Sequence, residues 1–463
     1  MNALGLRDPY HGHVTLDAPA APIIRRLVAG SIQAGIEELG GRPAMVVRST
    51  SDVRRGALSP DDGDTMAEAA AAALMLRIPY VLVLASSGAD VSGGVASLHG
   101  WGRAARALAS CSGVVPIVVI VTGPALSGPA LLLGLADVVV MTGDAFAFVS
   151  GPAMVEEFTG IRIGVRQLGG SAIHARTSGL SAIEATSVEQ ALEHVSHLLG
   201  LLPSHADELP PKVPSQQCED DEQISAIMPE RATSSYDVRR VASALADGGE
   251  LTELWPRWAP QLVTAFGRID GRTVGFVANQ PQALAGTLDI AASQKGARFV
   301  RFCDAFGVPL VTLVDTPGFL PGKDLEWRGM IRHGAELAFA YAEATVPRVC
   351  VILRKAFGGA YIVMDSKGLG NDLCVAWPGA QIAVMGAEGA VQILHRRSTP
   401  EVRAQLQDEY TKAFLTPYQA AERGFVDAVI DPVDTRSVVS DALALLETKR
   451  EMLPGRKHTV GPM

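Results

Sequence analysis

Short apolar runs alternate with turn-forming clusters and helical segments along most of the chain. Four of these runs are rich in Val, Ile and Leu and lie at residues 80–85, 116–122, 274–278 and 309–315. Each run ends at a cluster of small or polar residues and is followed by a helix-like pattern of small apolar residues. Such alternation predicts βαβ units, and therefore an α/β fold built on parallel strands.

A proline-rich segment interrupts this pattern near the middle of the chain. Residues 202–232 hold several prolines around an acidic run at 219–222 and show no usable apolar period. A length of 463 residues also exceeds what one hydrophobic core usually serves. We therefore predict an N-terminal domain, a linker and a C-terminal domain at residues 1–205, 206–232 and 233–463.

The two halves of the sequence repeat one pattern. The segments that begin at Val115 and Val346 each contain an apolar strand, a glycine-containing turn, a helix pattern and a second short strand. The second strand begins near Phe146 in one half and near Ile382 in the other. The halves are therefore predicted to be two copies of one fold.

The glycine-containing turns are the candidate chemical sites. In Gly358-Gly359-Ala360, backbone N–H groups stand at the start of a predicted helix, which favours binding of a negatively charged oxygen. Such a turn alone is more often a packing device, but a related turn recurs at Ser127-Gly128. Two donor pairs suit the transfer of a group between two carbonyl compounds.

Composition excludes some other classes of function. The formal charge is −9, without a concentrated basic tract, which argues against nucleic acid and anionic membrane surfaces as partners. Five widely spaced cysteines predict neither a zinc site nor a disulfide framework. No metal-ligand spacing stands out, and His174, His333 and His395 are predicted to be structural. Without a signal peptide or a membrane-spanning apolar run, a cytoplasmic protein is expected.

Several sequence blocks carry a specific resemblance to one family. They include VDTPGFLPG, RKAFGGAYIVM and AWPGAQIAVMGAEGAVQILHRR in the second half, and FVSGPAMVEEFTG and LGGSAIHARTSG in the first. In these blocks the chain resembles the carboxyltransferase (β) subunit of biotin-dependent acyl-CoA carboxylases, of the propionyl-CoA and acetyl-CoA carboxylase type. The resemblance extends from about Tyr80 to the C-terminus and is closest over residues 259–429.

The resemblance implies two tandem crotonase-like domains of the ClpP/crotonase superfamily, assembled as a hexamer. It implies transfer of a carboxyl group from carboxybiotin to the α-carbon of acetyl- or propionyl-CoA. Biotin would be carried by a partner, a biotin carboxylase with a biotin carboxyl carrier, and no metal would be needed. The N-terminal domain would serve the acyl-CoA and the C-terminal domain the biotin.

The resemblance also assigns roles to residues. Gly359 and Ala360 would hold the ureido oxygen of biotin, and Ser127 and Gly128 the thioester oxygen. An apolar Ile362 implies that acetyl-CoA is accepted as well as propionyl-CoA. The expected substrate-binding residues are Gly358, Ile362, Gly318, Phe319, Ser87 and Gly88.

Two departures from the family pattern lie in the first half. Asp90 stands where the family has an arginine, which would disfavour a polyanionic CoA if that loop touches it. Pro129 follows Gly128 and has no N–H to donate. Three readings therefore stay open: an ordinary acyl-CoA carboxylase subunit, a homologue that carboxylates or decarboxylates an unusual acyl substrate, and a non-catalytic assembly subunit.

Overall fold

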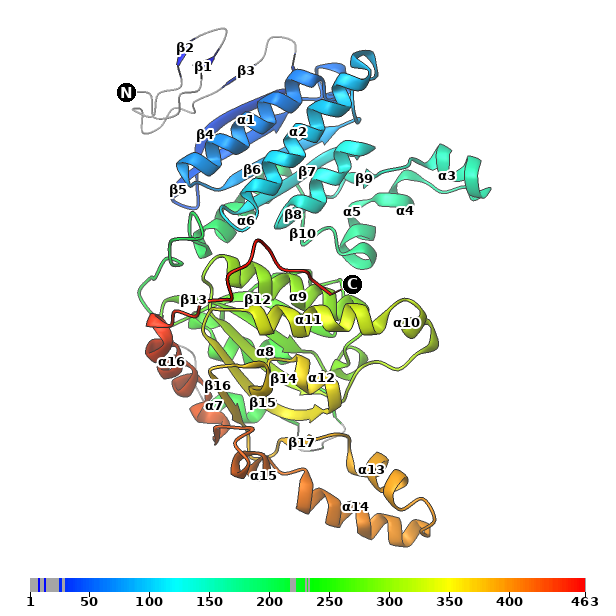
Figure 1. Cartoon of the computed structure of the whole chain (residues 1–463), viewed down its shortest axis with the longest axis vertical. Helices are drawn as coiled ribbons and strands as arrows, with labels where there is room; N and C mark the ends of the chain where they lie inside the picture. The colour runs from blue at the N-terminus through cyan, green and yellow to red at the C-terminus, as the bar shows by residue number, and fades with distance from the viewer. Residues whose placement is uncertain are drawn as a thin grey trace. The chain divides into compact units, whose positions relative to one another are not determined.

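The computed structural model describes residues 7–8, 12–13, 25–26, 30–216, 222–229, 231 and 234–462. The chain divides into two compact units, Met1–Pro211 and Lys212–Met463, called here the N-terminal and the C-terminal unit. Each unit contains one large sheet with helices packed on it (Figure 1).

The N-terminal unit is built on a mixed sheet. Its path follows the order β10-β8-β7-β6-β5-β4-β3, and β9 pairs with the end of β7. The β4–β5 hairpin is antiparallel, and the pairs from β5 to β10 are parallel. The strands are β3 (Arg25–Arg26), β4 (Ile32–Leu39), β5 (Arg42–Ser49), β6 (Tyr80–Ser86), β7 (Ile117–Leu126), β8 (Val138–Thr142), β9 (Phe146–Phe148) and β10 (Ile183–Ala185).

Helices cover this sheet on both faces. Helices α1 (Pro60–Leu76) and α2 (Val95–Cys111) lie side by side over one face (Figure 1). Helix α6 (Val188–Leu201) packs against β4, β7, β8 and β10. Residues Ile117 to Val121 of β7 are all fully buried. Burial on both faces explains why these strands read as continuous apolar runs in the sequence.

The C-terminal unit repeats this plan. Its sheet has the order β11-β12-β13-β14-β15-β16-β18, with β17 paired to the end of β15. The strands are β11 (Thr252–Leu254), β12 (Leu262–Ile269), β13 (Arg272–Asn279), β14 (Leu310–Thr316), β15 (Arg348–Phe357), β16 (Leu373–Ala376), β17 (Gln381–Ala383) and β18 (Ala428–Val429). The two copies predicted from the sequence are therefore confirmed as two parallel-sheet domains of one architecture.

Two layers of helices surround the second sheet. Helices α9 (Ile290–Ala305) and α11 (Met330–Glu343) lie side by side on one face (Figure 1). Helices α8 (Val238–Leu245) and α16 (Thr435–Leu445) contribute to the core on the other face. Helices α13 (Ala387–Leu394) and α14 (Pro400–Phe414) project from the body of this unit (Figure 1).

One unusual backbone segment occurs in both units. Arg55 (φ 56°) in the N-terminal unit and Ala285 (φ 53°) in the C-terminal unit adopt left-handed conformations directly before a glycine. A Cβ on Gly56 would lie 2.2 Å from the Ala85 carbonyl oxygen, and one on Gly286 would lie 2.5 Å from the corresponding oxygen of Asp315. The same close approach of a loop to a strand end therefore needs glycine in each copy.

Part of the predicted linker at 206–232 lies outside the described residues, namely 217–221, 230 and 232. Cys218 belongs to that part. Within the same range, Glu222–Ile227 forms helix α7, and its Ile224 is fully buried in the core of the C-terminal unit. The part of the chain that the structure describes contains no helix with the length and apolar character needed to cross a bilayer.

Candidate active site

The turn after β15 begins the candidate site of the C-terminal unit. Gly358 has φ +60°, which redirects the chain from the strand into the short helix α12 (Gly358–Val363). The N–H groups of Gly359 and Ala360 belong to the first turn of this helix, where the helix itself offers no acceptor. Gly359 is exposed and Ala360 is fully buried. The turn therefore places Gly359 at a surface that a ligand can reach, with Ala360 directly beneath it.

The turn after β7 has the same geometry at its first residue. Ser127 has φ +60°, and it follows Leu126, which pairs with Phe148 of β9. In the C-terminal unit, Gly358 follows a residue that pairs in the same way with β17. Ser127 therefore corresponds to Gly358, so that Gly128 corresponds to Gly359 and Pro129 to Ala360.

This correspondence reduces the number of donors in the N-terminal unit. The Ser127 N–H donates to the Phe148 carbonyl oxygen at 3.0 Å, so it is already engaged within the sheet. Pro129 has no N–H. Of the predicted pair Ser127 and Gly128, only Gly128 remains as a donor. After Gly128 the chain forms a 3₁₀ helix, Gly128–Leu135, rather than an α-helix.

A second loop lies beside each turn and is also duplicated. The Gly88 N–H donates to the Ser86 side-chain oxygen at 3.2 Å, and the Gly318 N–H donates to the Thr316 side-chain oxygen at 3.4 Å. Both glycines have positive φ, 112° for Gly88 and 142° for Gly318. The strand ends of β6 and β14 are therefore shaped alike.

These loops bring most of the predicted substrate-binding residues to the turns. A Cβ built on Gly88 would lie 3.4 Å from Ser127 Cβ, and one built on Gly359 would lie 3.5 Å from the Phe319 ring. Ser87 is exposed next to Gly88. Ser87 and Gly88 therefore lie near the turn at Ser127, and Phe319 lies near the turn at Gly359. Their roles in binding stay a prediction.

A cavity of about 470 Å³ adjoins the donor turn of the C-terminal unit. Its size falls within the usual range for small-molecule sites. The lining is mainly apolar and aromatic, and Arg423 is the one charged residue in it. The cavity is lined by Gly358, Gly359, Tyr361, Ile362, Ile382, Ala383, Val384, Tyr410, Ala413, Phe414, Gln419, Ala420, Arg423 and Phe425. Gly358, Gly359 and Ile362 therefore line one cavity, and the catalytic role of Gly359 and the substrate-binding roles of Gly358 and Ile362 stay predictions.

Several cavity residues were not predicted from the sequence. Tyr410 and Phe414 lie on α14, with ring centroids 5.0 Å apart, and Arg423 follows α15 (Pro417–Glu422). They come from segments far along the chain from Gly358 and carry no motif. A sequence feature that indicates Tyr410 and Phe414 is their spacing of four positions, which places two aromatic side chains together on an otherwise charged helix.

The Asp90 loop does not present a free negative charge. The Asp90 carboxylate forms an ion pair with Arg54 and accepts hydrogen bonds from the Ser92 N–H at 3.0 Å and the Ser92 hydroxyl at 2.8 Å. The hydroxyl of Ser92, with Arg54, holds the pKa of this carboxyl below its usual value. The expected repulsion of CoA phosphates by Asp90 is therefore offset by Arg54.

Two of the three histidines predicted to be structural make side-chain contacts in the structure. Both ring nitrogens of His174 are engaged, one with the Ser178 hydroxyl at 2.7 Å and the other with the Ala147 carbonyl at 2.8 Å. The Nδ1 atom of His333 lies 2.7 Å from Oε1 of Glu336. Within the described ranges, no group of three or more His, Cys, Asp or Glu side chains is placed to hold a metal ion.

Comparison with known families decides the class of protein. A model of the carboxyl transferase domain matches residues 10–460. The chain belongs to the carboxyl transferase domain family. It is a carboxyltransferase, as the resemblance in its sequence predicted.

Relatives within the family act on CoA esters, according to their names. The propionyl-CoA carboxylase beta chain of Saccharopolyspora erythraea is 43% identical over 439 residues, which cover 90% of this chain and 80% of that protein. The methylmalonyl-CoA carboxyltransferase 12S subunit of Propionibacterium freudenreichii is 40% identical over 437 residues, covering 93% of this chain and 83% of that protein.

A solved structure of the family confirms the fold class. The crystal structure of a transcarboxylase 12S hexamer with methylmalonyl-coenzyme A bound matches with a TM-score of 0.91 at 40% identity. The match covers 94% of this chain and 85% of that one. The two tandem crotonase-like domains expected from the sequence are therefore present.

Proposed function

We propose that this carboxyltransferase moves a carboxyl group from carboxybiotin to the α-carbon of a short acyl-CoA, such as acetyl- or propionyl-CoA. The observation that carries the proposal is the pair of backbone donors at Gly359 and Ala360 beside a largely apolar cavity in the C-terminal unit. The names of the relatives from Saccharopolyspora and Propionibacterium support the same substrate class.

The residues of the C-terminal unit fit a bicyclic urea. The cavity of about 470 Å³ is apolar enough for the rings, and Gly359 of the donor turn is one of its lining residues. Biotin, carried by a partner protein, supplies the transferable carboxyl group on its ureido nitrogen. The N–H groups of Gly359 and Ala360 bind the ureido oxygen and stabilise the negative charge that develops on it.

The N-terminal unit handles the acyl-CoA in this proposal. The Gly128 N–H binds the thioester oxygen and stabilises it as the α-carbon loses its proton. Gly88 and Ser87 line the same turn. The proton of the α-carbon would pass to the ureido nitrogen that the carboxyl group leaves, so that no side-chain base is required of this chain.

The partners follow from the same proposal. We propose a homohexamer, as in the transcarboxylase 12S structure, served by a biotin carboxylase and a biotin carboxyl carrier subunit. Ile362, which is 45% exposed at the cavity, supports use of acetyl-CoA as well as propionyl-CoA. A cytoplasmic location fits the free thiols of Cys111, Cys303, Cys350 and Cys374.

Pro129 favours a second candidate function. With one donor instead of two, the N-terminal turn stabilises an enolate oxygen less well, which favours an acyl substrate other than a simple acetyl or propionyl thioester. The methylmalonyl-CoA decarboxylase subunit alpha of Veillonella parvula, 38% identical over 437 residues, makes decarboxylation the alternative to examine.

The deciding experiment measures both directions of the reaction. Acetyl-, propionyl- and butyryl-CoA are each tested with labelled bicarbonate, ATP and a purified biotin carboxylase and carrier. Malonyl- and methylmalonyl-CoA are tested with free biotin as acceptor. Incorporation of label supports the carboxylase. Decarboxylation without incorporation supports the second candidate, and CoA binding by calorimetry without either reaction contradicts both.

A further inference from the structure

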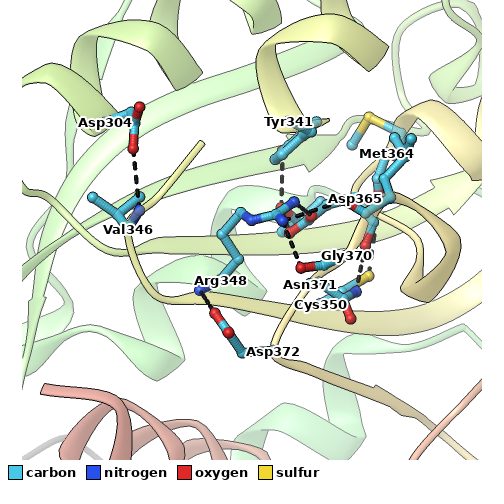
Figure 2. Close-up of polar contacts among 12 residues, drawn as sticks. Asp304, Tyr341, Val346, Arg348, Cys350, Met364, Asp365, Gly370, Asn371 and Asp372 are labelled. Carbon is cyan, nitrogen blue, oxygen red and sulfur yellow. Dashed lines mark hydrogen bonds and ion pairs between the residues drawn. The ribbon is translucent and has the colours of Figure 1, made fainter. Parts of the chain in front are cut away.

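A buried ion pair lies behind the donor turn of the C-terminal unit. Arg348 Nη1 and Asp365 Oδ1 are 2.7 Å apart, and the two side chains are 2% and 0% exposed (Figure 2). Arg348 is the first residue of β15, and Asp365 follows α12 after a single intervening residue. The pair therefore joins the beginning of the strand to the end of the helix that the strand leads into.

Asp365 is held by its side chain and its backbone. It has φ +57°, a conformation that non-glycine residues adopt at a cost unless their surroundings fix it. The Asn371 side-chain amide donates to the Asp365 carbonyl at 2.5 Å, and the Thr312 hydroxyl lies 3.4 Å from Oδ2. The Tyr341 hydroxyl lies 2.9 Å from that of Thr312. The position of Asp365 is thus fixed from several neighbouring elements.

Arg348 extends the same network to the loop beyond α12. Its Nη2 donates to the carbonyl oxygen of Gly370 at 2.6 Å (Figure 2) and to that of Leu369 at 3.2 Å. Its backbone N–H donates to Asp372 Oδ2 at 2.8 Å. One guanidinium therefore ties the carboxylate at one end of this loop to carbonyl groups near its other end.

We propose that Arg348 and Asp365 are positioning residues for carboxyl transfer. By fixing the end of α12, they orient the N–H groups of Gly359 and Ala360 at its beginning. Helix α12 has six residues, too few to be stable or rigid by itself. Its orientation is therefore set by its surroundings: the strand β15 before it, the ion pair after it, and the packing of its buried Ala360 and Tyr361 against neighbouring elements. This inference rests on the donor role given to Gly359 and Ala360 above.

The C-terminal unit also provides a matched control. Asp304 accepts a hydrogen bond from the Val346 N–H at 3.1 Å (Figure 2). It accepts another from the Thr345 N–H at 2.6 Å. It thus anchors the segment that enters β15, through contacts with Thr345 and Val346 and not with α12 residues. Replacing Asp304 weakens a comparable anchor of the same strand without touching the helix.

The test compares Asp365→Asn with Asp304→Asn in the full chain. Two quantities are measured: carboxyl transfer from malonyl- or methylmalonyl-CoA to free biotin, and hydrogen–deuterium exchange in peptides covering residues 358–363. Misplaced donors are expected to lower transfer to biotin by about a hundredfold. The KM for the CoA ester is expected to stay unchanged. Exchange in α12 rises in Asp365→Asn and not in Asp304→Asn.

A milder variant covers the case in which Asp365→Asn does not fold. Arg348→Lys keeps a positive charge for Asp365, but one ammonium cannot reproduce the two-branched contact with the carboxylate and the loop carbonyls. Transfer to biotin is expected to fall less in Arg348→Lys than in Asp365→Asn. Hydrogen–deuterium exchange in α12 is likewise expected to rise less. Equal loss in Asp304→Asn, or α12 exchange that does not change in the Asp365 and Arg348 variants, overturns the inference.

The outcome also separates this inference from the proposed function. If the wild-type chain transfers nothing to biotin, the proposed function fails, while the exchange measurement still decides whether the ion pair orders α12. If exchange rises in Asp365→Asn but transfer to biotin is unaffected, the ion pair is structural only, and the positioning role is wrong.

Discussion

The two units share one backbone plan but differ at the point where the chemistry is expected. In the C-terminal unit the turn reads Gly358-Gly359-Ala360 and is backed by a buried ion pair. In the N-terminal unit the turn reads Ser127-Gly128-Pro129. The fold alone therefore does not determine how many donors a turn offers, because one proline removes a donor without changing the architecture.

The difference extends into the core beneath the turns. Ile117 opens β7 and donates its N–H to Asp137 at 2.8 Å, as Arg348 opens β15 and donates to Asp372. The equivalent strand position thus carries an apolar side chain in one unit and a buried arginine in the other. The anchoring of the helix after the turn is a property of the C-terminal unit, in which we place biotin.

The largest effect is expected when the N-terminal pattern is copied into the C-terminal unit. Ala360→Pro removes one N–H from the donor pair, and transfer to biotin is expected to fall by about 10²- to 10³-fold. Steady-state rates with free biotin measure this. Ala360→Ser, which keeps the N–H, is the control. A variant that retains full activity would contradict the assignment of Ala360 as a donor.

The reciprocal change is expected to improve the N-terminal turn. Pro129→Ala restores an N–H at the position that corresponds to Ala360, and turnover of acyl-CoA is expected to rise by up to about a hundredfold. The measurement is kcat for acetyl- and propionyl-CoA with the carrier partner. No change would mean that the turn at Gly128 does not hold the reacting oxygen.

The next-largest effect is expected at acid pH, where Asp365 of the buried ion pair becomes protonated. Burial raises the pKa of Asp365 to about 6, although Arg348 acts in the opposite direction. Among the groups around it, Tyr341 and Cys350 have pKa values raised well above their usual range, so they stay protonated. Arg348 and Asp372 are the charged neighbours. Protonation of Asp365 removes its charge and weakens the pair.

Lowering the pH is expected to have opposite effects on the rate of transfer to biotin and on the stability that Asp365 contributes. Transfer to biotin is expected to be about tenfold slower near pH 5 than near pH 8, since only a minor fraction of Asp365 is then ionised. The unfolded carboxyl still ionises at pH 5, so the folded state binds more protons, and this group adds stability as the pH falls. If Asp365→Asn still loses transfer activity at acid pH, that loss comes from protonation of another group.

The smallest effect is expected at the Asp90 loop. Because Asp90 is paired with Arg54, Asp90→Ala is expected to change CoA affinity by less than about fivefold. Calorimetry with CoA measures it. Asp64→Ala, which breaks an exposed pair with Arg103 in the same unit, is the control. A large gain in affinity would restore the interpretation of Asp90 as a repulsive charge.

The sequence predicted the strands and the duplication well because these features are local or periodic. The runs at 80–85 and 309–315 match β6 and β14 within one residue at each end. The turn at Gly358 was found because it interrupts an apolar run. The equivalence of Pro129 with Ala360 became visible only through the pairing of β7 with β9 and of β15 with β17.

The long-range polar contacts were not predictable in the same way. Arg348 and Asp365 are seventeen positions apart and belong to no motif. Arg54 and Asp90, thirty-six positions apart, read in the sequence as two unrelated surface charges. Such pairs depend on how strands and loops converge, so sequence periodicity carries no information about them.

The buried pair of Arg348 and Asp365 also limits how this protein can evolve. Losing either partner alone leaves a buried charge without compensation, a change that is strongly destabilising, whereas replacing both by apolar residues is often tolerated. The two positions are therefore expected to change together or not at all. Because substitutions arise one at a time, replacing both residues requires a variant that carries only one of them and still folds.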